Sequence, residues 1–181
     1  MAPGQNNVNT TDINPALDPV AAMPLDVMGL FFFAYRDFVG DADALLERQG
    51  FGRAHHRVLY FVNLKPGMPV ADLLDILKIT KQSLARVLRQ LIDNGYIEQK
   101  TGDADRRQRL LHLTPRGESL RLALMAPQIA RIRRAIAQSG RDSGRHYRTV
   151  LYHLVSPENR DSVRDWIEKA GLIGDGEGAR G

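Results

Sequence analysis

Apolar residues recur at helical spacing along most of this chain, and one stretch joins two such segments to two strand-like runs. The periodic segments lie at 70–78 and 81–94 and are separated only by a short turn. Gly95 follows the second segment, where a glycine typically ends a helix. Two β-prone runs come next, at 96–100 and 109–114, on either side of a charged loop. The predicted order is helix, turn, helix, hairpin.

Helical segments also precede and follow this motif, so the predicted fold class is mainly α with a small β wing. We expect a winged helix-turn-helix domain flanked by a helical dimerisation layer. In the first helix, Phe31, Phe32 and Phe33 belong to an apolar surface that covers most of the circumference, which predicts burial against both its own core and a partner subunit. The expected parts are a flexible arm at 1–23, the N-terminal dimerisation helix at 24–52, the winged domain at 53–117, the C-terminal dimerisation helices at 118–173 and a flexible tail at 174–181.

The helices after the wing are predicted from caps and apolar stripes. Thr114 is a good N-cap and Pro115 suits the first helical position, so a long helix should begin there. Two shorter helices follow, and the last of them carries Val163, Trp166 and Ile167 on one face. We expect these late helices to join the first helix in the dimerisation layer.

The second helix of the motif, 81–94, has one apolar face and one cationic face. Its polar face carries no acidic residue before Asp93, whereas a solvated helix usually mixes both signs of charge. This chemistry fits a recognition helix in the major groove of double-stranded DNA. Gln82, Ser83 and Arg86 would reach base edges, and Lys81 and Arg89 would contact phosphates. An ordinary basic surface helix is the alternative, because such turns also occur in domains that bind no nucleic acid.

The loop between the two strand-like runs is too polar to pack and carries adjacent arginines, Arg106 and Arg107. An arginine at a loop tip can enter the narrow, electronegative minor groove. Asp105 lies two residues before Arg107 and would pair with it, which would hold the side chain extended before binding. The predicted wing therefore spans 96–114 and places Asp105, Arg106 and Arg107 at DNA. The alternative is a solvated turn, since exposed ion pairs contribute little.

Charge and composition support this interpretation and exclude others. The 181-residue chain has a net charge of +4, and nine Lys or Arg face four acidic residues within 78–116. It has no cysteine, which excludes disulfides and thiol chemistry. No signal peptide and no apolar run long enough for a membrane span are visible, so we expect a cytoplasmic protein with no membrane partner. No glycine loop for phosphate, metal-ligand cluster or nucleophile motif is present, so we expect neither an enzyme nor a cofactor.

Aromatic and imidazole side chains near the start of the chain suggest a site for a small-molecule effector. Its candidate residues are Phe32, Tyr35, His55 and His56, because ligand pockets are commonly lined by aromatic groups. Packing is the competing interpretation for the aromatic residues. Adjacent histidines on a helix do not share a face, so His55 and His56 cannot bind one metal ion together in the usual way.

The wing and its surroundings resemble the MarR family of bacterial transcription regulators. Residues 103–109 read DADRRQR and are followed by Leu113-Thr114 and Gly117, which is similar to the family's wing signature D-P-x-D-R-R, then L-T-x-x-G. The run LIDNGYI at 91–97 resembles the family's end of the recognition helix. The resemblance covers 53–117 well and the flanking helices more weakly, and the region 31–50 resembles the PetP-like branch.

The resemblance implies an obligate homodimer on a pseudo-palindromic DNA site, commonly a repressor, which a small anionic or phenolic effector releases. The chain departs from the family pattern at Ala104, where proline is frequent, and at Gln82-Ser83, where many members carry a Ser-Thr pair. Base preference therefore cannot be transferred. Without cysteine, the chain is not one of the family's thiol-based oxidant sensors. The alternative function is a winged-helix adaptor that binds a protein partner instead of DNA.

Overall fold

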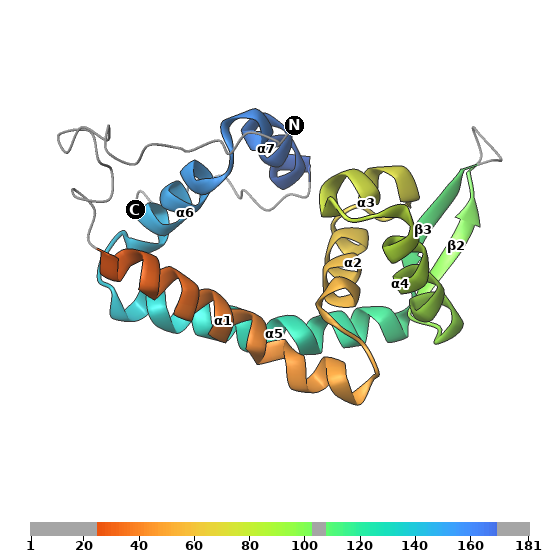
Figure 1. The fold of residues 1–181 in the computed structure, drawn as a ribbon, viewed down its shortest axis with the longest axis horizontal. Coiled ribbons are helices and arrows are strands. Elements are labelled where there is room, and N and C mark those ends of the chain that lie inside the picture. The colour runs from red at the N-terminus through yellow and green to blue at the C-terminus, as the bar shows by residue number, and fades with distance from the viewer. Residues whose placement is uncertain (1–24, 103–107, 170–181) are drawn as a thin grey trace, which may run out of the picture. The chain divides into compact units, whose positions relative to one another are not determined.

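The computed structural model describes residues 25–102 and 108–169, and Figure 1 labels their elements. The chain divides into two compact units, residues 1–38 and 39–181, with the boundary inside α1. The predicted fold class is confirmed, because helices predominate around a three-stranded antiparallel sheet of order β1-β3-β2. The elements are α1 (Leu25–Arg48), α2 (Arg53–Leu64), β1 (Met68–Pro69), α3 (Val70–Leu77), α4 (Lys81–Asp93), β2 (Ile97–Thr101), β3 (Arg109–Leu113), α5 (Pro115–Gln138), α6 (Ser143–Leu154), a 3₁₀ turn η1 (Pro157–Asn159) and α7 (Arg160–Lys169).

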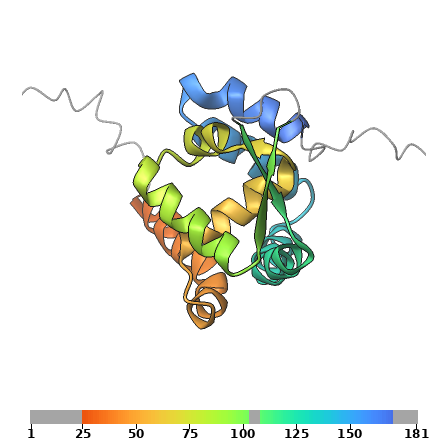
Figure 2. The same cartoon turned by 90° about the vertical axis from the view of Figure 1, so that its right-hand side faces the viewer.

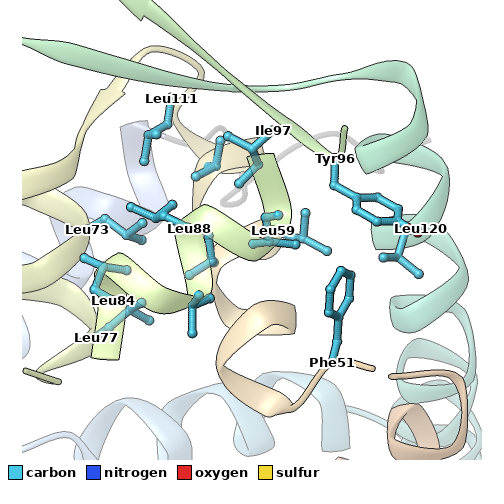
Figure 3. Close-up of a cluster of buried hydrophobic side chains, with 14 of the residues drawn as sticks. Phe51, Leu59, Leu73, Leu77, Leu84, Leu88, Tyr96, Ile97, Leu111 and Leu120 are labelled. Atoms are coloured by element: carbon cyan, nitrogen blue, oxygen red, sulfur yellow. The ribbon is translucent and has the colours of Figure 1, made fainter. Parts of the chain in front are cut away.

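An apolar cluster formed by described residues of the range 39–181 is the core of the winged domain. Side chains from α2, α3, α4 and the sheet meet there, and Figure 3 shows Leu59, Leu73, Leu88 and Leu111 within the cluster. On α4 the buried set is Leu84, Val87, Leu88 and Leu91, which is the face that its periodicity predicts. Burial of one face of α4 leaves its opposite face exposed.

The turn between α3 and α4 is short and well defined. Lys78 follows α3 in the left-handed region (φ 50°, ψ 41°), and its amide donates to the carbonyl of Leu74 over 3.0 Å. Thr80 then caps α4, because its Oγ1 accepts a hydrogen bond of 3.1 Å from the amide of Ser83. This cap sets the direction in which α4 leaves the turn.

We expect Thr80→Ala to lower the free energy of unfolding by about 1 kcal/mol, since it removes the acceptor for an N-terminal amide of α4. Urea denaturation followed by circular dichroism would measure this change. Thr80→Ser retains the acceptor and serves as the control. Equal stability of the alanine and serine variants would contradict the capping role.

The wing is a hairpin that β1 extends by one short strand. β2 pairs with β3 from Ile97 opposite Leu113 to Thr101 opposite Arg109, and Met68 of β1 lies opposite Leu111. Met68, Ile97 and Leu111 are fully buried, so the inner face of the sheet belongs to the domain core. Figure 2 shows the hairpin beside α4. The predicted strand runs agree with β2 and β3 to within one residue at each end.

Two carboxylates in the C-terminal half of α1 fasten it to neighbouring helices. The carboxylate of Asp41 accepts two hydrogen bonds from Arg131 on α5, one from Nε at 2.6 Å and one from Nη2 at 2.7 Å. The carboxylate of Asp43 likewise accepts hydrogen bonds from Nε and Nη2 of Arg53 on α2, at 3.1 and 2.7 Å. In each pair the hydrogen bond from the arginine lowers the pKa of the carboxyl group. Asp41 and Asp43 therefore stabilise the packing of α1 against α5 and α2.

Among the described residues, no helix is long and apolar enough to cross a membrane.

Candidate nucleic-acid interface

The exposed face of α4 carries most of the residues predicted to contact DNA. Lys81, Gln82, Arg86 and Arg89 are exposed, and Ser83 is half-buried beside them. α4 has 13 residues, and these five side chains lie on one side of it within about three helical turns. Figure 2 shows α4 running along the outside of the domain. A helix of this length with one uncovered cationic face can lie in a major groove.

The cations on this face differ from most others in the described chain by having no partner. Among the described residues, neither Lys81 nor Arg86 nor Arg89 makes an ion pair or a side-chain hydrogen bond. Elsewhere, arginine side chains such as Arg53 and Arg131 are held by carboxylates. An unpaired cation can approach a phosphate or a base without first breaking an internal contact. The arrangement on α4 is therefore suited to an anionic partner.

Lys78 is a further cation of this group. Its charge belongs to the basic balance of 78–116, but the sequence predicted no DNA contact for it. It is exposed at the left-handed position between α3 and α4, and within the described part of the chain it has no ion-pair partner. The signal that could have found it is the helix end itself, because a residue in the turn next to a recognition helix faces the same side as its N-terminus.

Positive charge on the wing strands and at the start of α5 is largely used within the protein. Lys100 pairs with Glu98 at 2.8 Å, and Arg109 donates to Oγ1 of Thr101 over 3.1 Å. Arg116 donates to the carbonyl of Asn94 and lies 4.5 Å from the Tyr96 ring centroid. These three residues shape the hairpin and its exit. The predicted tip residues Asp105, Arg106 and Arg107 lie outside the described residues.

The orientation of α4 is also fixed on its flank by an imidazole. Nε2 of His55 lies 2.8 Å from Oε1 of Gln90, while Nδ1 of His55 accepts the amide of Gly52 over 3.0 Å. With Nδ1 as the acceptor, Nε2 carries the proton and donates to Gln90. His55 is buried and stacks on Phe51, with ring centroids 4.5 Å apart. Both ring nitrogens of His55 are thus engaged in joining α2 to α4.

The other residues predicted for an effector site have different surroundings. His56 is half-buried, and burial lowers the pKa of its imidazole while the nearby Asp43 carboxylate partly opposes that shift. His56 is therefore neutral at physiological pH. Phe32 and Tyr35 lie on the N-terminal half of α1 and are exposed. The structure thus shows His55 in a structural role and leaves three of the four side chains with accessible surface.

Besides Leu122 and Ile129 of α5, two helices carry most of the large apolar side chains that are exposed among the described residues. They lie on α1 at Val27, Met28, Leu30, Phe31, Phe32, Phe33 and Tyr35, and on α6 at Tyr147, Val150, Leu151 and Leu154. Exposed apolar side chains that gather on one helix are a common feature of protein interaction surfaces. These are side chains of the helices that the sequence assigns to a dimerisation layer, which stays a prediction.

The helix-turn-helix, the paired hairpin and the uncovered cationic face of α4 define a winged helix-turn-helix protein. A model of the MarR family matches residues 49–108. The HTH-type transcriptional regulator PetP of Rhodobacter capsulatus is 44% identical over 129 residues, which are 71% of this chain and 78% of that protein. This chain belongs to the MarR family of transcription regulators. It is a DNA-binding regulator and not an enzyme.

Solved structures of the family share this fold at low sequence identity. The Mycobacterium tuberculosis MarR family protein RV2887 in complex with p-aminosalicylic acid is 24% identical, covers 74% of this chain and 100% of its own, and gives a TM-score of 0.52. A point mutant of S. aureus MepR bound to an oligodeoxyribonucleotide is 19% identical, covers 71% of this chain and 95% of its own, and gives a TM-score of 0.51. The expected resemblance to the MarR family, PetP included, is confirmed.

Proposed function

We propose that this regulator is a cytoplasmic homodimer that binds a two-fold symmetric DNA site, with α4 in the major groove and the wing in the minor groove. The observation that carries the proposal is the row of unpaired cations, Lys81, Arg86 and Arg89, on the exposed face of α4. Gln82 and Ser83 add hydrogen-bonding groups near the N-terminus of the same helix, where base edges are read. MepR, which shares the fold, has been solved bound to an oligodeoxyribonucleotide, and this supports DNA as the partner.

The test is selection of duplexes from a random-sequence pool by the purified protein, followed by a mobility-shift titration of the selected sequence. We expect an enriched sequence with two inverted half-sites about one helical turn apart, because a two-fold dimer places its recognition helices at that spacing. Binding should weaken steeply as salt rises, since phosphate contacts release counterions. A pool that shows no enrichment at low salt would refute the proposal.

Dimerisation rests on the exposed apolar side chains of α1 and α6. Light scattering after size-exclusion chromatography should give twice the mass of the 181-residue chain. Replacing Leu151 and Leu154 of α6 by serine should shift that mass toward the monomer. The alternative adaptor function predicts a monomer that selects no DNA sequence, so the same two measurements separate the two functions.

We propose in addition that the regulator represses and that a small aromatic acid releases it. The ligand of RV2887, p-aminosalicylic acid, is a molecule of this class. Its candidate residues are those that the sequence suggests, Phe32, Tyr35, His55 and His56, and His55 in addition holds α2 against α4. Titration of the DNA complex with p-aminosalicylic acid would test release, with benzylamine as a cationic control of similar size. Retention of DNA at saturating acid would refute it.

The tip of the wing supplies another prediction. We expect Arg107→Ala to weaken binding to the selected duplex about tenfold, because one good arginine contact to DNA is worth ~1–3 kcal/mol. Fluorescence anisotropy with a labelled duplex would measure the change. Asp105→Ala should weaken binding less, since it removes only the partner proposed to hold Arg107 extended. Unchanged affinity of Arg107→Ala would exclude the tip from the interface.

A further inference from the structure

The last helix, α7, packs on the DNA-binding domain through the only tryptophan of the chain. Trp166 lies edge-on to Phe61 of α2, with ring centroids 6.3 Å apart and an angle of 75° between the rings. Phe61 itself packs against the domain core, and Trp166 is half-buried there. The sequence placed this residue in the dimerisation layer. In the structure α7 returns from α6 toward α2 and α3 (Figure 1), where Trp166 meets Phe61 and Lys65.

A lysine at the end of α2 extends this contact to the start of α3. The ammonium group of Lys65 lies 5.5 Å from the Trp166 ring centroid and 2.6 Å from Oδ2 of Asp72. Asp72 is in the first turn of α3, where a carboxylate also complements the helix dipole. Ring, cation and carboxylate therefore form a continuous link from α7 to the first helix of the helix-turn-helix.

The other end of α7 is fixed to α6. The guanidinium of Arg160 donates to the carbonyls of Val155 and His153, at 3.0 and 2.8 Å. Arg164 donates to the hydroxyl of Tyr152 and lies 5.6 Å from its ring centroid. Two arginines thus hold the corner between α6 and α7, so that α7 cannot move independently of α6 without losing several hydrogen bonds.

We propose that α7 braces the helix-turn-helix, with Trp166 and Lys65 as positioning residues for α3. An eight-residue helix such as α3 is not stable by itself and depends on what packs against it. α3 in turn packs against α4 through the cluster that contains Leu73, Leu77 and Leu84 (Figure 3). Loss of the brace should therefore loosen α3 first and disturb the presentation of α4 to DNA. The second consequence rests on the proposed DNA binding; the first does not.

Hydrogen exchange of the full-length protein without DNA tests the brace directly. In Trp166→Ala we expect amides within Val70–Leu77 to exchange about fivefold faster or more, because an aromatic pair and a cation–π contact are lost. Trp166→Phe keeps an aromatic ring against Phe61 and should restore most of the protection. Glu168→Gln, an exposed change on the same helix, should behave as wild type.

Each outcome of this comparison decides the proposal. Faster exchange confined to α3 and its neighbours, with rescue by phenylalanine, supports the brace. Unchanged exchange in α3 overturns it, and so does an equal increase throughout the core of α4 and β3, which would show a general loss of stability.

Should Trp166→Ala fail to fold, the variant Lys65→Met decides between these outcomes. That variant keeps the aromatic packing and removes the cation, and it should speed exchange in α3 about twofold. No change in Lys65→Met would then overturn the proposal.

The functional consequence is measured on the duplex that the wild type selects from the random pool. We expect Trp166→Ala to bind it about fivefold more weakly and Trp166→Phe to bind it nearly as tightly as wild type. Equal affinity of Trp166→Ala and wild type would show that the brace does not reach α4. If the wild type selects no duplex, the proposed function fails, and hydrogen exchange in α3 still decides whether α7 is a brace.

Discussion

Arg86→Ala should lower the affinity of the regulator for its selected duplex by about tenfold to a hundredfold, as expected for one arginine contact to a base edge. Arg86 lies in the middle of the exposed face of α4, and within the described part of the chain it has no ion-pair partner. Its removal therefore leaves no buried charge behind. Alanine is also the best helix former, so α4 should remain intact.

The pattern across DNA sequences distinguishes a base contact from a phosphate contact. Arg86→Ala should lose most of its affinity for the selected duplex and little for a duplex of unrelated sequence. Lys81→Ala should weaken both about equally and reduce the slope of log affinity against log salt by about 1. Anisotropy titrations at several salt concentrations would measure both quantities. Arg141→Ala, an exposed arginine in the turn after α5, provides the control for loss of one positive charge.

An equal loss for both duplexes in Arg86→Ala would reassign Arg86 to phosphate. No loss for either duplex would remove α4 from the interface, and with it the observation on which the proposed function rests. The experiment thus tests the role of one residue and the orientation of the whole helix together.

Local sequence signals predicted the helix-turn-helix because local interactions determine it. The apolar positions of α4 recur at helical spacing, and Thr80 caps the helix through its own side chain. Lys78 takes the left-handed conformation at the turn. Each of these features involves residues within four positions of one another, so a single stretch of sequence contains the information. The hairpin was predictable for the same reason, because its strands are close in the chain.

Long-range pairing was not predictable, and it changes how the positive charge is interpreted. Arg109 and Arg116 contribute to the basic balance of the motif, yet each donates to a group elsewhere in the chain. The partner of Arg116 is the backbone of Asn94, 22 positions earlier in the chain. Only the fold brings such groups together, so a charge count overestimates the cations available to DNA.

Trp166 and His55 show the same limit. An amphipathic stripe predicts that Trp166 packs, but the stripe does not say against which helix. Its partner Phe61 is 105 positions away in the sequence. His55 has the composition of a ligand-site residue and nevertheless joins Gly52 to Gln90, 35 positions from itself. For both residues, the chemistry of the side chain suggested roles, and the partners it contacts became known only from the fold.

Gly117 is the residue for which we expect the largest loss of stability. It closes the L-T-x-x-G run after the wing and is the third residue of α5, which begins at Pro115. A Cβ atom placed on Gly117 would lie 2.0 Å from the carbonyl oxygen of Tyr96 and 3.0 Å from its carbonyl carbon. That carbonyl accepts the amide of Thr114 over 3.1 Å, while Oγ1 of Thr114 accepts the amide of Gly117 over 3.1 Å. The glycine therefore allows α5 to start directly against the entry of the wing.

Gly117→Ala should lower the free energy of unfolding by about 3 kcal/mol, because the backbone at Tyr96 must move and the hydrogen bond from Thr114 must lengthen or break. For a chain of this size the midpoint of thermal unfolding should fall by about 10 °C. Differential scanning calorimetry at one fixed protomer concentration would measure it. Gly40→Ala is the matched control, since a Cβ there meets nothing within 4 Å and alanine favours helix, so stability should stay the same or rise. If both variants unfold at the wild-type temperature, α5 does not start against the wing as closely as the structure has it.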